Sequence, residues 1–322
     1  MKEIADAVTD LLTIDVGGRG VIGDLSEGAH AYHGRSPILE AAEQLTESIT
    51  SSDTVFIVTG FLCPPTAAQE TDGPVGAASL ARAIKLGLGA HPILMAEAEA
   101  VPMIESAARS YGLDVGEPSK VRDGDWSCSV KPIPTDGDDA DTFASDMVDT
   151  YDPAAVIAIE RAGANINDEY YSMSGTNITN ESAKAEQLFE LTDGLTIGIG
   201  DGGNEIGMGV IEETVREKVP HAEQGGTECG GGIAATSEVD VIVPVTVSNW
   251  GGHGISAVLS VLLDQTVLHK PELEKRALVQ CGLTGGIDGP TGKTTGASDG
   301  LSASAHASVI ELLHEIIAES SF

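Results

Sequence analysis

Basic residues are scarce in this sequence. The 322 residues include 17 Lys and Arg against 50 Asp and Glu, which gives a formal net charge of −33 at pH 7. A surface of that sign repels phosphates, so the first functions to exclude are binding to a nucleic-acid backbone and to an anionic membrane. An anionic ligand has to enter a pocket lined by local positive charge or by helix dipoles. We therefore expect a small-molecule substrate, with no nucleic acid and no membrane as partner.

Clustered metal-binding residues, long apolar runs and a basic leader are also missing. The cysteines Cys63, Cys128, Cys229 and Cys281 form no CxxC pair and the histidines do not cluster, so the spacing predicts no zinc site. No run reaches the roughly 18 apolar residues of a membrane span. The N-terminal stretch MKEIADAVTDLLTIDV is acidic and amphipathic, unlike a signal peptide. We expect a cytoplasmic protein.

Aromatic residues make up only 4% of the chain, while 41% of the residues are hydrophobic and 39 are glycine. That hydrophobic fraction is normal for a packed domain and argues against disorder, so the acidic side chains are expected on a folded surface. The composition is typical of cytoplasmic proteins of salt-loving microbes, in which concentrated salt screens the self-repulsion. We expect a halophilic protein that loses structure in low salt.

Short apolar segments alternate with longer helical ones, which is the pattern of βαβ units. The predicted strands are 54–60, 91–96, 154–160, 195–200, 239–247 and 277–282. The predicted helices are about 2–12, 37–49, 75–88, 98–111, 140–150, 181–191, 204–218, 252–266 and 300–318. The fold class predicted is α/β, with three αβα layers and a mainly parallel sheet covered by helices on both faces. Residues 1–322 are expected to form a single domain, with an acidic, turn-rich insertion or connection at about 112–139.

Polar residues follow several predicted strands, at the carboxyl ends where open α/β sheets bind ligands. After strand 54–60, Thr71, Asp72 and Gly73 lead into a helix that begins with proline. Asp72 either caps free N–H groups of that helix, or the helix start faces an anionic group of a substrate. Both interpretations stay open.

The predicted strand 154–160 ends in Glu160, followed by Arg161. An acid at the end of an apolar strand is expected to be paired, metal-bound or a base with a raised pKa. Arg161 either clamps a carboxylate or forms an ion pair with Glu160 that braces the loop. Tyr170 and Tyr171, in a chain with 5 Tyr, form either a pocket wall or plain packing.

The segment LTIGIGDGGNEIGMG, 195–209, places a glycine turn after a strand. Its glycines do not match GxGxxG, so it does not predict dinucleotide binding. The amides of Gly202 and Gly203 can approach an anion, and Asp201 and Glu205 offer oxygen ligands to a hard divalent cation, with Asn204 between them. The same glycines can instead serve close packing of a helix on the sheet.

A third strand exit carries Ser248, Asn249 and Trp250, followed by His253. The histidine is either an acid or base, or a hydrogen-bonded residue of the turn. Further on, GGIDGPTGKTTG does not match a phosphate-binding loop, because five residues separate its glycines where four are required. Asp288 and Asp299 are interpreted there as turn residues that can add an acid to the site.

Together these motifs resemble the D-glutamate cyclase family, in particular the carboxyl-terminal, cyclase-like domain of its longer eukaryotic members. The resemblance rests on TGF with ETDGPVGAASLARAI, on AIERAGAN and YYSMSG, on IGIGDGGNEIGMG, on SNWGG and on DGPTG with SDGL, and it runs from about residue 10 to 305. It implies a hydro-lyase that converts D-glutamate to 5-oxo-D-proline with loss of water. The longer proteins carry a second domain, so whether this chain alone is active stays open.

Ring closure needs the α-amine as a free base and a γ-carboxylate whose charge is neutralised. We expect Glu160 or Glu205 to take the ammonium proton, and Asp72 with Asn249 to orient the amino-acid head. The catalytic residues expected are Glu160, Arg161, Asp201 and Glu205, with Asp201 and Glu205 as ligands of a Mg²⁺ or Mn²⁺ ion. The substrate-binding residues expected are Thr71, Asp72, Gly73, Tyr170, Tyr171, Gly202, Gly203, Asn204, Ser248, Asn249 and Trp250.

Two other functions fit the same residues. One is a Mg²⁺-dependent enzyme that handles phosphate or nucleotides, and the other is a non-catalytic amino-acid-binding protein. The sequence also leaves open whether the chain forms a homo-oligomer.

Overall fold

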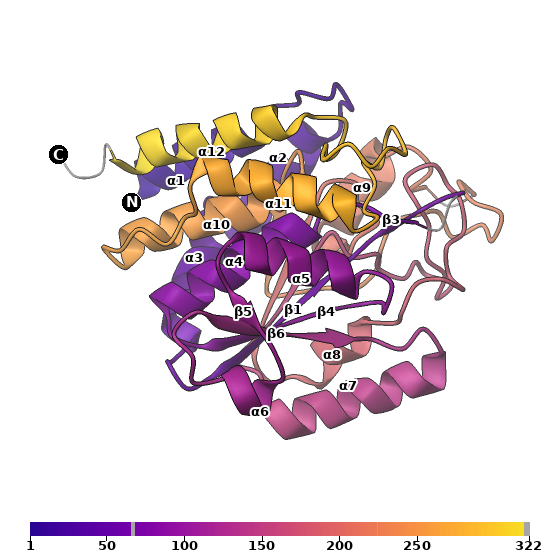
Figure 1. Cartoon of the computed structure of the whole chain (residues 1–322). Helices are drawn as coiled ribbons and strands as arrows, with labels where there is room; N and C mark the ends of the chain where they lie inside the picture. The colour runs from indigo at the N-terminus through magenta and orange to yellow at the C-terminus, as the bar shows by residue number, and fades with distance from the viewer. Residues whose placement is uncertain (66–67, 224, 319–322) are drawn as a thin grey trace.

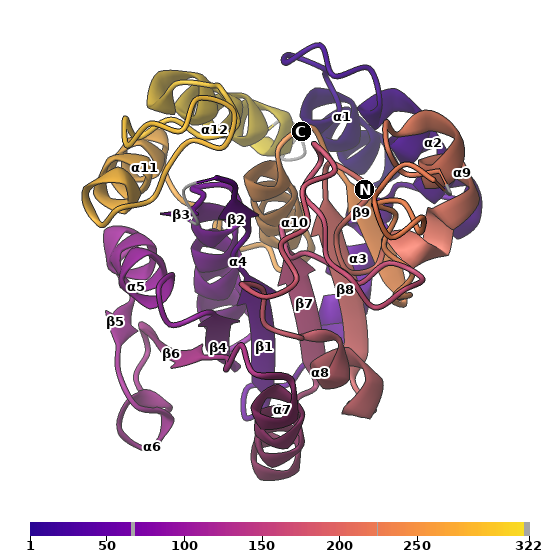
Figure 2. The same cartoon turned by 90° about the vertical axis from the view of Figure 1, so that its right-hand side faces the viewer.

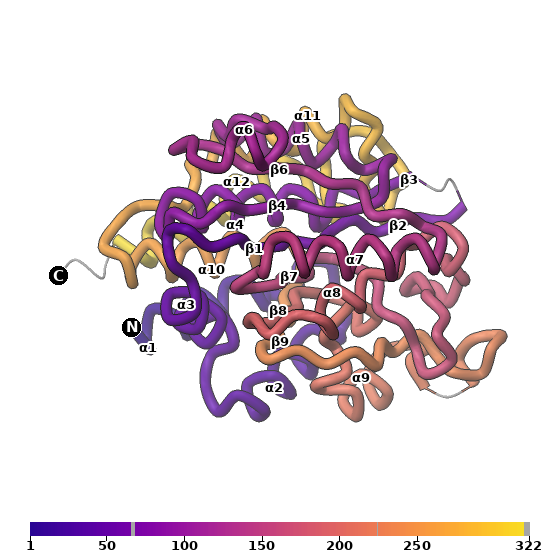
Figure 3. Tube along the Cα trace, turned by 90° about the horizontal axis from the view of Figure 1, so that it is seen from below, coloured from indigo at the N-terminus to yellow at the C-terminus, as the bar shows by residue number. Residues whose placement is uncertain are grey.

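A parallel sheet runs through the centre of the protein. The computed structural model describes residues 1–65, 68–223 and 225–318, and in this part of the chain seven strands form one sheet in the order β5-β6-β4-β1-β7-β8-β9. Their bounds are β1 Thr54–Thr59, β4 His91–Ala96, β5 Asp114–Val115, β6 Ser127–Pro132, β7 Ala155–Ile159, β8 Leu195–Gly200 and β9 Val241–Pro244. Each neighbouring pair is parallel. Figure 3 shows strands β6 to β9 succeeding one another in this order.

Helices cover both faces of the sheet, which confirms the predicted three-layer α/β class. One face carries α3 Pro37–Ser48, α4 Pro74–Gly87, α5 Val101–Ser110 and α10 Ser248–Leu262, and outside these lie α1 Lys2–Leu12, α11 Pro271–Leu283 and α12 Ala303–Ala318. The other face carries α2 Ile22–His33, α7 Gly137–Tyr151, α8 Glu186–Leu191, the short helix η1 Met208–Ile211 and α9 Glu212–Lys218. Figure 1 shows α4, α10, α11 and α12 above the sheet and α7 below it, and Figure 2 shows α2 next to α9.

Side chains on the two faces of the central strands pack into two separate hydrophobic cores. In β1, Val55 and Ile57 belong to the core beneath α4 and α10, while Phe56 and Val58 belong to the core on the side of α7 and α8. Side chains alternate across a strand, so a strand buried on both faces has to be apolar throughout. This is why β1 could be predicted from its composition alone.

One predicted strand is wrong. Residues 277–282 lie inside α11, not in the sheet. Its buried residues Ala277, Leu278 and Cys281 follow helical spacing, and Pro271 stands at the first position of the helix. A short apolar run of this kind fits a buried strand and a helix face equally well, and here the helix is what the chain forms.

The segment 112–139, expected as an insertion or connection, contains β5 and β6, with the short helix α6 Pro118–Val121 between them. The edge strand β5 pairs with β6 over only two residues, and the second half of β6 is not fully buried. Such a strand needs fewer apolar residues than a central one, so the polar sequence of β6, SCSVKP, hides it from a search for apolar runs. Helix α2 is absent from the sequence prediction for a related reason, because Gly23 and Gly28 lower its helix propensity.

The direction in which successive strands are added to the sheet reverses between β1 and β7. From β1 it moves outward to β4 and β6 on one side, and from β7 it moves outward to β8 and β9 on the other. Such a switch point opens a crevice at the carboxyl ends of the two strands. Within the described residues, no helix combines the length and apolar character needed to cross a membrane.

Candidate active site

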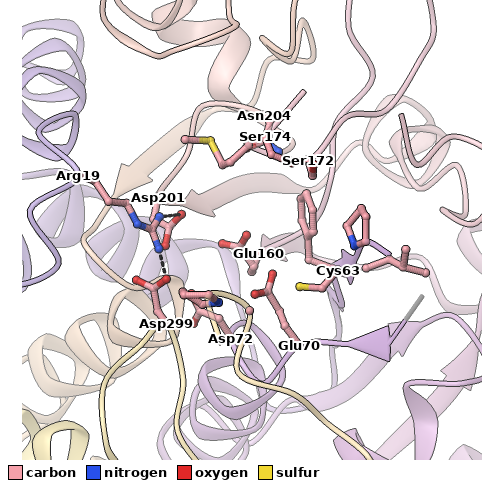
Figure 4. A pocket seen from close by; sticks show the side chains of 16 residues that line it. Arg19, Cys63, Glu70, Asp72, Glu160, Ser172, Ser174, Asp201, Asn204 and Asp299 are labelled. Carbon is pink, nitrogen blue, oxygen red and sulfur yellow. Dashed lines mark hydrogen bonds and ion pairs between the residues drawn. The ribbon is translucent and has the colours of Figure 1, made fainter. Parts of the chain in front are cut away.

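A cavity of about 320 Å³ lies at this switch point, beyond the carboxyl ends of β1, β7 and β8. Its volume is at the lower end of the roughly 300–1,000 Å³ typical of small-molecule sites. The polar side chains that line it are Arg19, Cys63, Glu70, Asp72, Glu160, Ser172, Ser174, Asp201, Asn204 and Asp299 (Figure 4). They come from six separate parts of the sequence, so only the fold assembles them.

Carboxyl groups dominate this cavity. Glu70, Asp72, Glu160, Asp201 and Asp299 all line it, and Arg19 is the one cationic residue among its described lining residues. Carboxylates brought close together away from water resist simultaneous ionisation. The cavity therefore holds protons at a pH at which exposed carboxyl groups have lost them.

Glu160 stands at the centre of the group, immediately after β7. It is only 6% exposed, and its backbone has a φ of 46°, a left-handed conformation that a non-glycine residue rarely adopts. The hydroxyl of Ser248 donates a hydrogen bond of 2.5 Å to its Oε2. Burial raises its pKa well above the usual value of 4.5, and the charges of Asp201 and of other nearby carboxylates raise it further. Backbone strain of this kind concentrates at functional sites.

Asp72 caps a helix, although not the helix that it precedes. Its Oδ2 accepts the backbone N–H of Ser248 at 2.9 Å, and its Oδ1 accepts that of Asn249 at 2.8 Å, both in the first turn of α10. The capping interpretation is therefore right in kind, but α10 takes the place of α4. Burial raises the pKa of Asp72 well above the usual 3.8, and Asp201 and Asp299 add to the rise.

Gly73 lets Asp72 lie against Glu160. It has a φ of 92°, and a Cβ at this position would come within 2.5 Å of Thr59 Oγ1 and 2.8 Å of Glu160 Cβ. A glycine is needed here for its conformation and for its lack of a side chain.

Arg19 bridges two acids at one side of the cavity. Its guanidinium contacts Asp201 Oδ1 at 2.7 Å and also pairs with Asp299 (Figure 4). Burial nevertheless raises the pKa of Asp201 to about 6, against the lowering effect of Arg19. Burial and the charge of Asp201 raise the pKa of Asp299 to about 7. Asp299 has a φ of 50°, a second non-glycine residue in the left-handed region.

Glu70 and Cys63 occupy the opposite side of the cavity in Figure 4. Burial raises the pKa of Glu70 well above its usual value, and Asp72 and Asp201 raise it further. Burial also raises the pKa of the Cys63 thiol, and the nearby Glu70 carboxylate adds to the rise. A thiol in this environment stays protonated and is a poor nucleophile.

Glu205 turns away from the cavity and closes its own turn. Its Oε1 accepts the backbone N–H groups of Asp201 and Gly202, and its Oε2 accepts that of Gly203, at 2.6 to 2.9 Å. The side chain is fully buried. The structure therefore corrects two expectations. Glu205 does not reach a substrate as a base or metal ligand, and the amides of Gly202 and Gly203 already have an anion, which is Glu205 itself.

Asn204, in the same turn, does line the cavity. Its Nδ2 donates to the carbonyl of Tyr171 at 2.7 Å, while its buried Oδ1 has no hydrogen-bond partner among the described residues. A buried amide oxygen without a partner is costly unless a ligand or water donates to it. Asn204 thus offers an acceptor to a bound molecule.

A metal ion finds its best oxygen set in a different group from the one expected. Asp72, Glu160 and Asp201 each offer a carboxylate oxygen, and these atoms lie within 4.8 Å of one another. Carboxylate oxygens suit Mg²⁺ and Mn²⁺. Asp201 stays in the expected set, and Asp72 and Glu160 replace Glu205.

Arg161 does not line the cavity and instead holds together the loops around it. It is 1% exposed, and its guanidinium pairs with Glu97 at 2.7 Å rather than with Glu160. It also donates to the backbone carbonyls of Gly60 and Ala183. The expected carboxylate clamp is therefore corrected to a buried ion pair that fixes the loops after β1 and β7.

The two tyrosines do not line the cavity. Tyr170 donates to Glu186 at 2.7 Å and Tyr171 donates to Glu169 at 2.5 Å, and both rings are buried in packing contacts. The packing interpretation describes them correctly.

Three other residues predicted to bind the substrate, Thr71, Asn249 and Trp250, do not line the cavity. Asn249 accepts the backbone N–H of Gly76 and donates to the carbonyl of Thr71, which ties the starts of α4 and α10 together. Thr71 donates to the carbonyl of Ala297 at 2.7 Å, and the Trp250 indole donates to His306 at 2.9 Å. These residues position the site without lining it. His253 is fully buried in α10 beside Glu274, likewise away from the cavity.

Sequence reasoning missed two important residues. Arg19 lies in the loop between α1 and α2, far from any strand end, and Glu70 directly follows the short hairpin of β2 Leu62–Cys63 and β3 Ala68–Gln69. An arginine within the run GGRG of a chain so poor in basic residues was the available signal for Arg19. Asp299 had been predicted to add an acid, and it does line the cavity.

Comparison with known proteins agrees with the resemblance seen in the sequence. A family model described as "D-glutamate cyclase-like, C-terminal" matches residues 8–314. The human protein named "D-glutamate cyclase, mitochondrial" is 28% identical over 242 residues. That match covers 71% of this chain and 36% of the human protein, so the chain spans about a third of the length of that relative.

Proposed function

The chain belongs to the D-glutamate cyclase-like family, and from this membership we propose that it is a hydro-lyase that closes D-glutamate to 5-oxo-D-proline with loss of water. One observation supports the proposal most. Glu160, with a raised pKa, stands between Asp72 and Asp201 in a cavity of small-molecule size at the switch point of the sheet. Such an arrangement suits a reaction that moves protons from an ammonium nitrogen to a departing carboxyl oxygen.

The reaction moves protons from one group of the substrate to another, and the closely spaced carboxyl groups of the cavity can carry them. Closing the ring forms a bond between the α-nitrogen and the carbon of the γ-carboxyl group, and it breaks the bond between that carbon and one of its two oxygens. The ammonium group gives up two protons, and the departing oxygen gains two to leave as water. The site must therefore relay protons without a net gain or loss, which is general acid and base catalysis.

We assign the base to Glu160. An acidic cavity attracts the α-ammonium group, and the ionised form of a carboxyl group with a raised pKa is a stronger base than an ordinary carboxylate. The Ser248 hydroxyl holds Oε2 of Glu160, which leaves Oε1 to take the proton. The freed amine can then attack the γ-carboxyl carbon.

We assign the acid to Asp201 or Asp299. Their pKa values of about 6 and about 7 keep a fraction of each protonated near neutral pH, so either can protonate the departing oxygen. Arg19 lies between them and supplies the positive charge that a substrate carboxylate requires. A divalent cation held by Asp72, Glu160 and Asp201 would help to neutralise the γ-carboxylate, and because it would keep Asp201 ionised, Asp299 would then be the acid.

The cavity also orients its substrate. D-Glutamate is flexible, and holding its amine against its γ-carboxyl group converts a rare conformation into the bound one. Because the amine and the γ-carboxyl group already belong to one molecule, the contribution of orientation here is the selection of this reactive conformation. The unpartnered Oδ1 of Asn204 and the hydroxyls of Ser172 and Ser174 are polar groups that can hold the substrate.

The test is turnover followed by chiral analysis. The chain is incubated in concentrated KCl with D-glutamate or with L-glutamate, and 5-oxoproline is separated by chiral chromatography. We expect 5-oxo-D-proline from D-glutamate, formed in equal amount to the substrate consumed. A folded protein that binds D-glutamate and converts none would be an amino-acid-binding protein, and this proposal would be wrong.

A further inference from the structure

A second cavity, of about 610 Å³, lies at the other end of the sheet. Ser51 and Gly89 line it just before β1 and β4 begin, whereas the candidate active site follows the carboxyl ends of the strands. Its other walls are the last turns of α4, the segment between α6 and β6, and the loop after α10. In Figure 1, the label α6 lies near the second cavity, and the label β3 marks the hairpin beside the candidate active site.

Three cations line this second cavity. Arg82 and Lys85 come from α4, and Arg122 follows α6. In a chain with 17 basic residues and a net charge of −33, such a gathering needs an explanation. Asp123 and Asp125 also line the cavity. Three cationic residues against two carboxylates leave the lining with a net positive charge.

No carboxylate neutralises these cations directly. Within the described residues, none of the three takes part in an ion pair of 4.0 Å or less. Lys85 is only 7% exposed, and its Nζ donates to the carbonyl of Arg122 at 3.0 Å. Arg122 donates to the Thr54 hydroxyl and a backbone carbonyl, and Arg82 donates to another backbone carbonyl.

Several donors in this cavity stay available. The Nε of Arg82 is buried and has no hydrogen-bond partner among the described residues. A guanidinium group has five N–H donors and an ammonium group has three, and the hydrogen bonds of these side chains to the described residues use only part of them. The acceptors of these hydrogen bonds are neutral oxygens, and Asp123 and Asp125, which do not pair directly with the three cations, offset their charge only in part. An anion would supply both the missing charge and the missing acceptors.

The neighbouring groups respond to this positive charge. Burial lowers the pKa of His91 to about 4, and Lys85 and Arg122 lower it further. Burial also lowers the pKa of Lys85, against the raising effect of Asp123 and Asp125, while Arg122 makes a smaller contribution in the lowering direction. The effect of Lys85 and Arg122 on His91 shows that their positive charge reaches a neighbouring group.

Trp126 adds an aromatic wall. Its indole is 48% exposed, and the guanidinium carbon of Arg82 lies 5.4 Å from the ring centroid. This contact fixes the guanidinium group on one face of the ring. The exposed part of the indole is a surface on which a planar ring can stack.

From this cavity we infer a second binding site, for a small anion that carries phosphate groups. Two guanidinium groups and an ammonium group match the geometry of phosphate oxygens, which accept paired N–H donors. The phosphate groups can come from inorganic pyrophosphate or from a nucleotide, and stacking on Trp126 separates these two sources. The site lies apart from the acidic cavity, so it does not depend on the proposed cyclase activity.

The test is titration calorimetry of the full chain with pyrophosphate, ADP and citrate. It uses the lowest KCl concentration at which the circular dichroism is native, because salt weakens charge-driven binding. The variants are Arg82→Gln, Lys85→Gln and Arg122→Gln, with Lys275→Gln on the exposed side of α11 as the charge-matched control. Trp126→Phe and Trp126→Ala test the stacking.

We expect pyrophosphate to bind with a Kd below about 1 mM, and each cavity variant to weaken it about tenfold, or about 1.4 kcal/mol. The Lys275→Gln variant should bind like wild type. ADP that binds more tightly than pyrophosphate, and loses this advantage in Trp126→Ala, identifies a nucleotide site. Absence of pyrophosphate binding, an equal loss in the control, or citrate binding as tightly as pyrophosphate would overturn the inference. If the three cations only join loops, Lys85→Gln lowers the melting temperature while the wild type binds no phosphate, which also overturns it.

Discussion

The hydroxyl of Ser248 donates a 2.5 Å hydrogen bond to Oε2 of Glu160 and joins the first residue of α10 to the residue that follows β7. The same helix start donates two backbone N–H groups to Asp72. One helix terminus therefore fixes two carboxyl groups of the candidate active site. This arrangement predicts that Ser248 acts by positioning Glu160, since it does not line the cavity itself.

Replacing this hydroxyl should slow the reaction without weakening substrate binding. We expect Ser248→Ala to lower kcat about tenfold with little change in KM, since the hydrogen bond is worth about 1.5–3 kcal/mol to a charged group. The hydroxyl stabilises the ionised carboxylate, so its loss raises the pKa of Glu160, and the acid limb of the pH–rate profile should move to higher pH. Ser256→Ala is the control, because that hydroxyl donates only to a carbonyl of its own helix. An unchanged pH profile in Ser248→Ala would contradict the positioning role.

The stability of the fold should fall as the pH rises from about 4 to about 7. Asp201 and Asp299 have folded-state pKa values of about 6 and about 7, above the usual 3.8. Their contribution to stability is fully present below the unfolded pKa and is lost once the pH has risen through the folded one. We expect the melting temperature in metal-free buffer to decrease between about pH 4 and pH 7 and to level off above pH 7, and Asp299→Asn to flatten this decrease. Asparagine tolerates the left-handed backbone at this position.

The control for that series is Asp149→Asn, on the exposed side of α7. It removes the same charge far from the cavity, so its pH dependence should match that of the wild type. A decrease of equal slope in Asp299→Asn and in the wild type would show that the cavity acids do not cause it.

A divalent cation should stabilise the protein through Asp72, Glu160 and Asp201. Binding of Mn²⁺ at about 100 times its Kd adds about 2.7 kcal/mol to the free energy of unfolding. We expect Mn²⁺ to raise the melting temperature of the wild type and EDTA to reverse the rise. The rise should disappear in Glu160→Gln and persist in Glu70→Gln, which removes the same charge from the same cavity but lies outside this ligand set. Equal rises in both variants would exclude this set of ligands.

The surface charge predicts a requirement for salt. The buried acidic residues of the described chain are Asp72, Glu97, Glu160, Asp201, Glu205, Glu274 and Asp288, and the others are at least partly exposed. Their repulsion reaches over a Debye length of about 10 Å at 0.1 M salt but only about 3 Å at 1 M. We expect the circular dichroism melting temperature to fall steeply below molar KCl. A melt that is the same in low and molar KCl would contradict the halophilic assignment.

Much of the fold could be predicted from the sequence, because the signals for its central strands and for some helix starts lie within short stretches of the chain. The central strands are apolar on both faces, so β1, β4, β7 and β8 stand out, and Ser36 with Pro37 marks the start of α3. Strands close to the edge of the sheet and helices that contain glycine carry weaker signals, which is why β6 and α2 were missed.

The candidate site was predicted in part, because strand ends can be found in a sequence but side-chain directions cannot. Asp72, Glu160, Asp201 and Asn204 do line one cavity, as their places after strands suggested. Glu205 could not be distinguished from Asp201 by spacing, since only the backbone geometry of the turn directs it to three N–H groups.

Arg19 depends on a contact that spans 182 residues, from the loop after α1 to Asp201. No local pattern could place it there. Arg161 shows the opposite case, because its position beside Glu160 in the sequence suggested a shared role, while the left-handed turn at Glu160 sends the two side chains to different surroundings.

The most direct test of the central claim is single-turnover conversion of D-glutamate by the wild type and by Glu160→Gln, with Glu190→Gln on α8 as a charge-matched control. Loss of a general base costs about 10²- to 10⁴-fold in rate. We predict a loss in that range for Glu160→Gln, with a native circular dichroism spectrum and a rate for Glu190→Gln within about twofold of wild type. A Glu160→Gln variant that forms 5-oxo-D-proline at the wild-type rate would contradict the account.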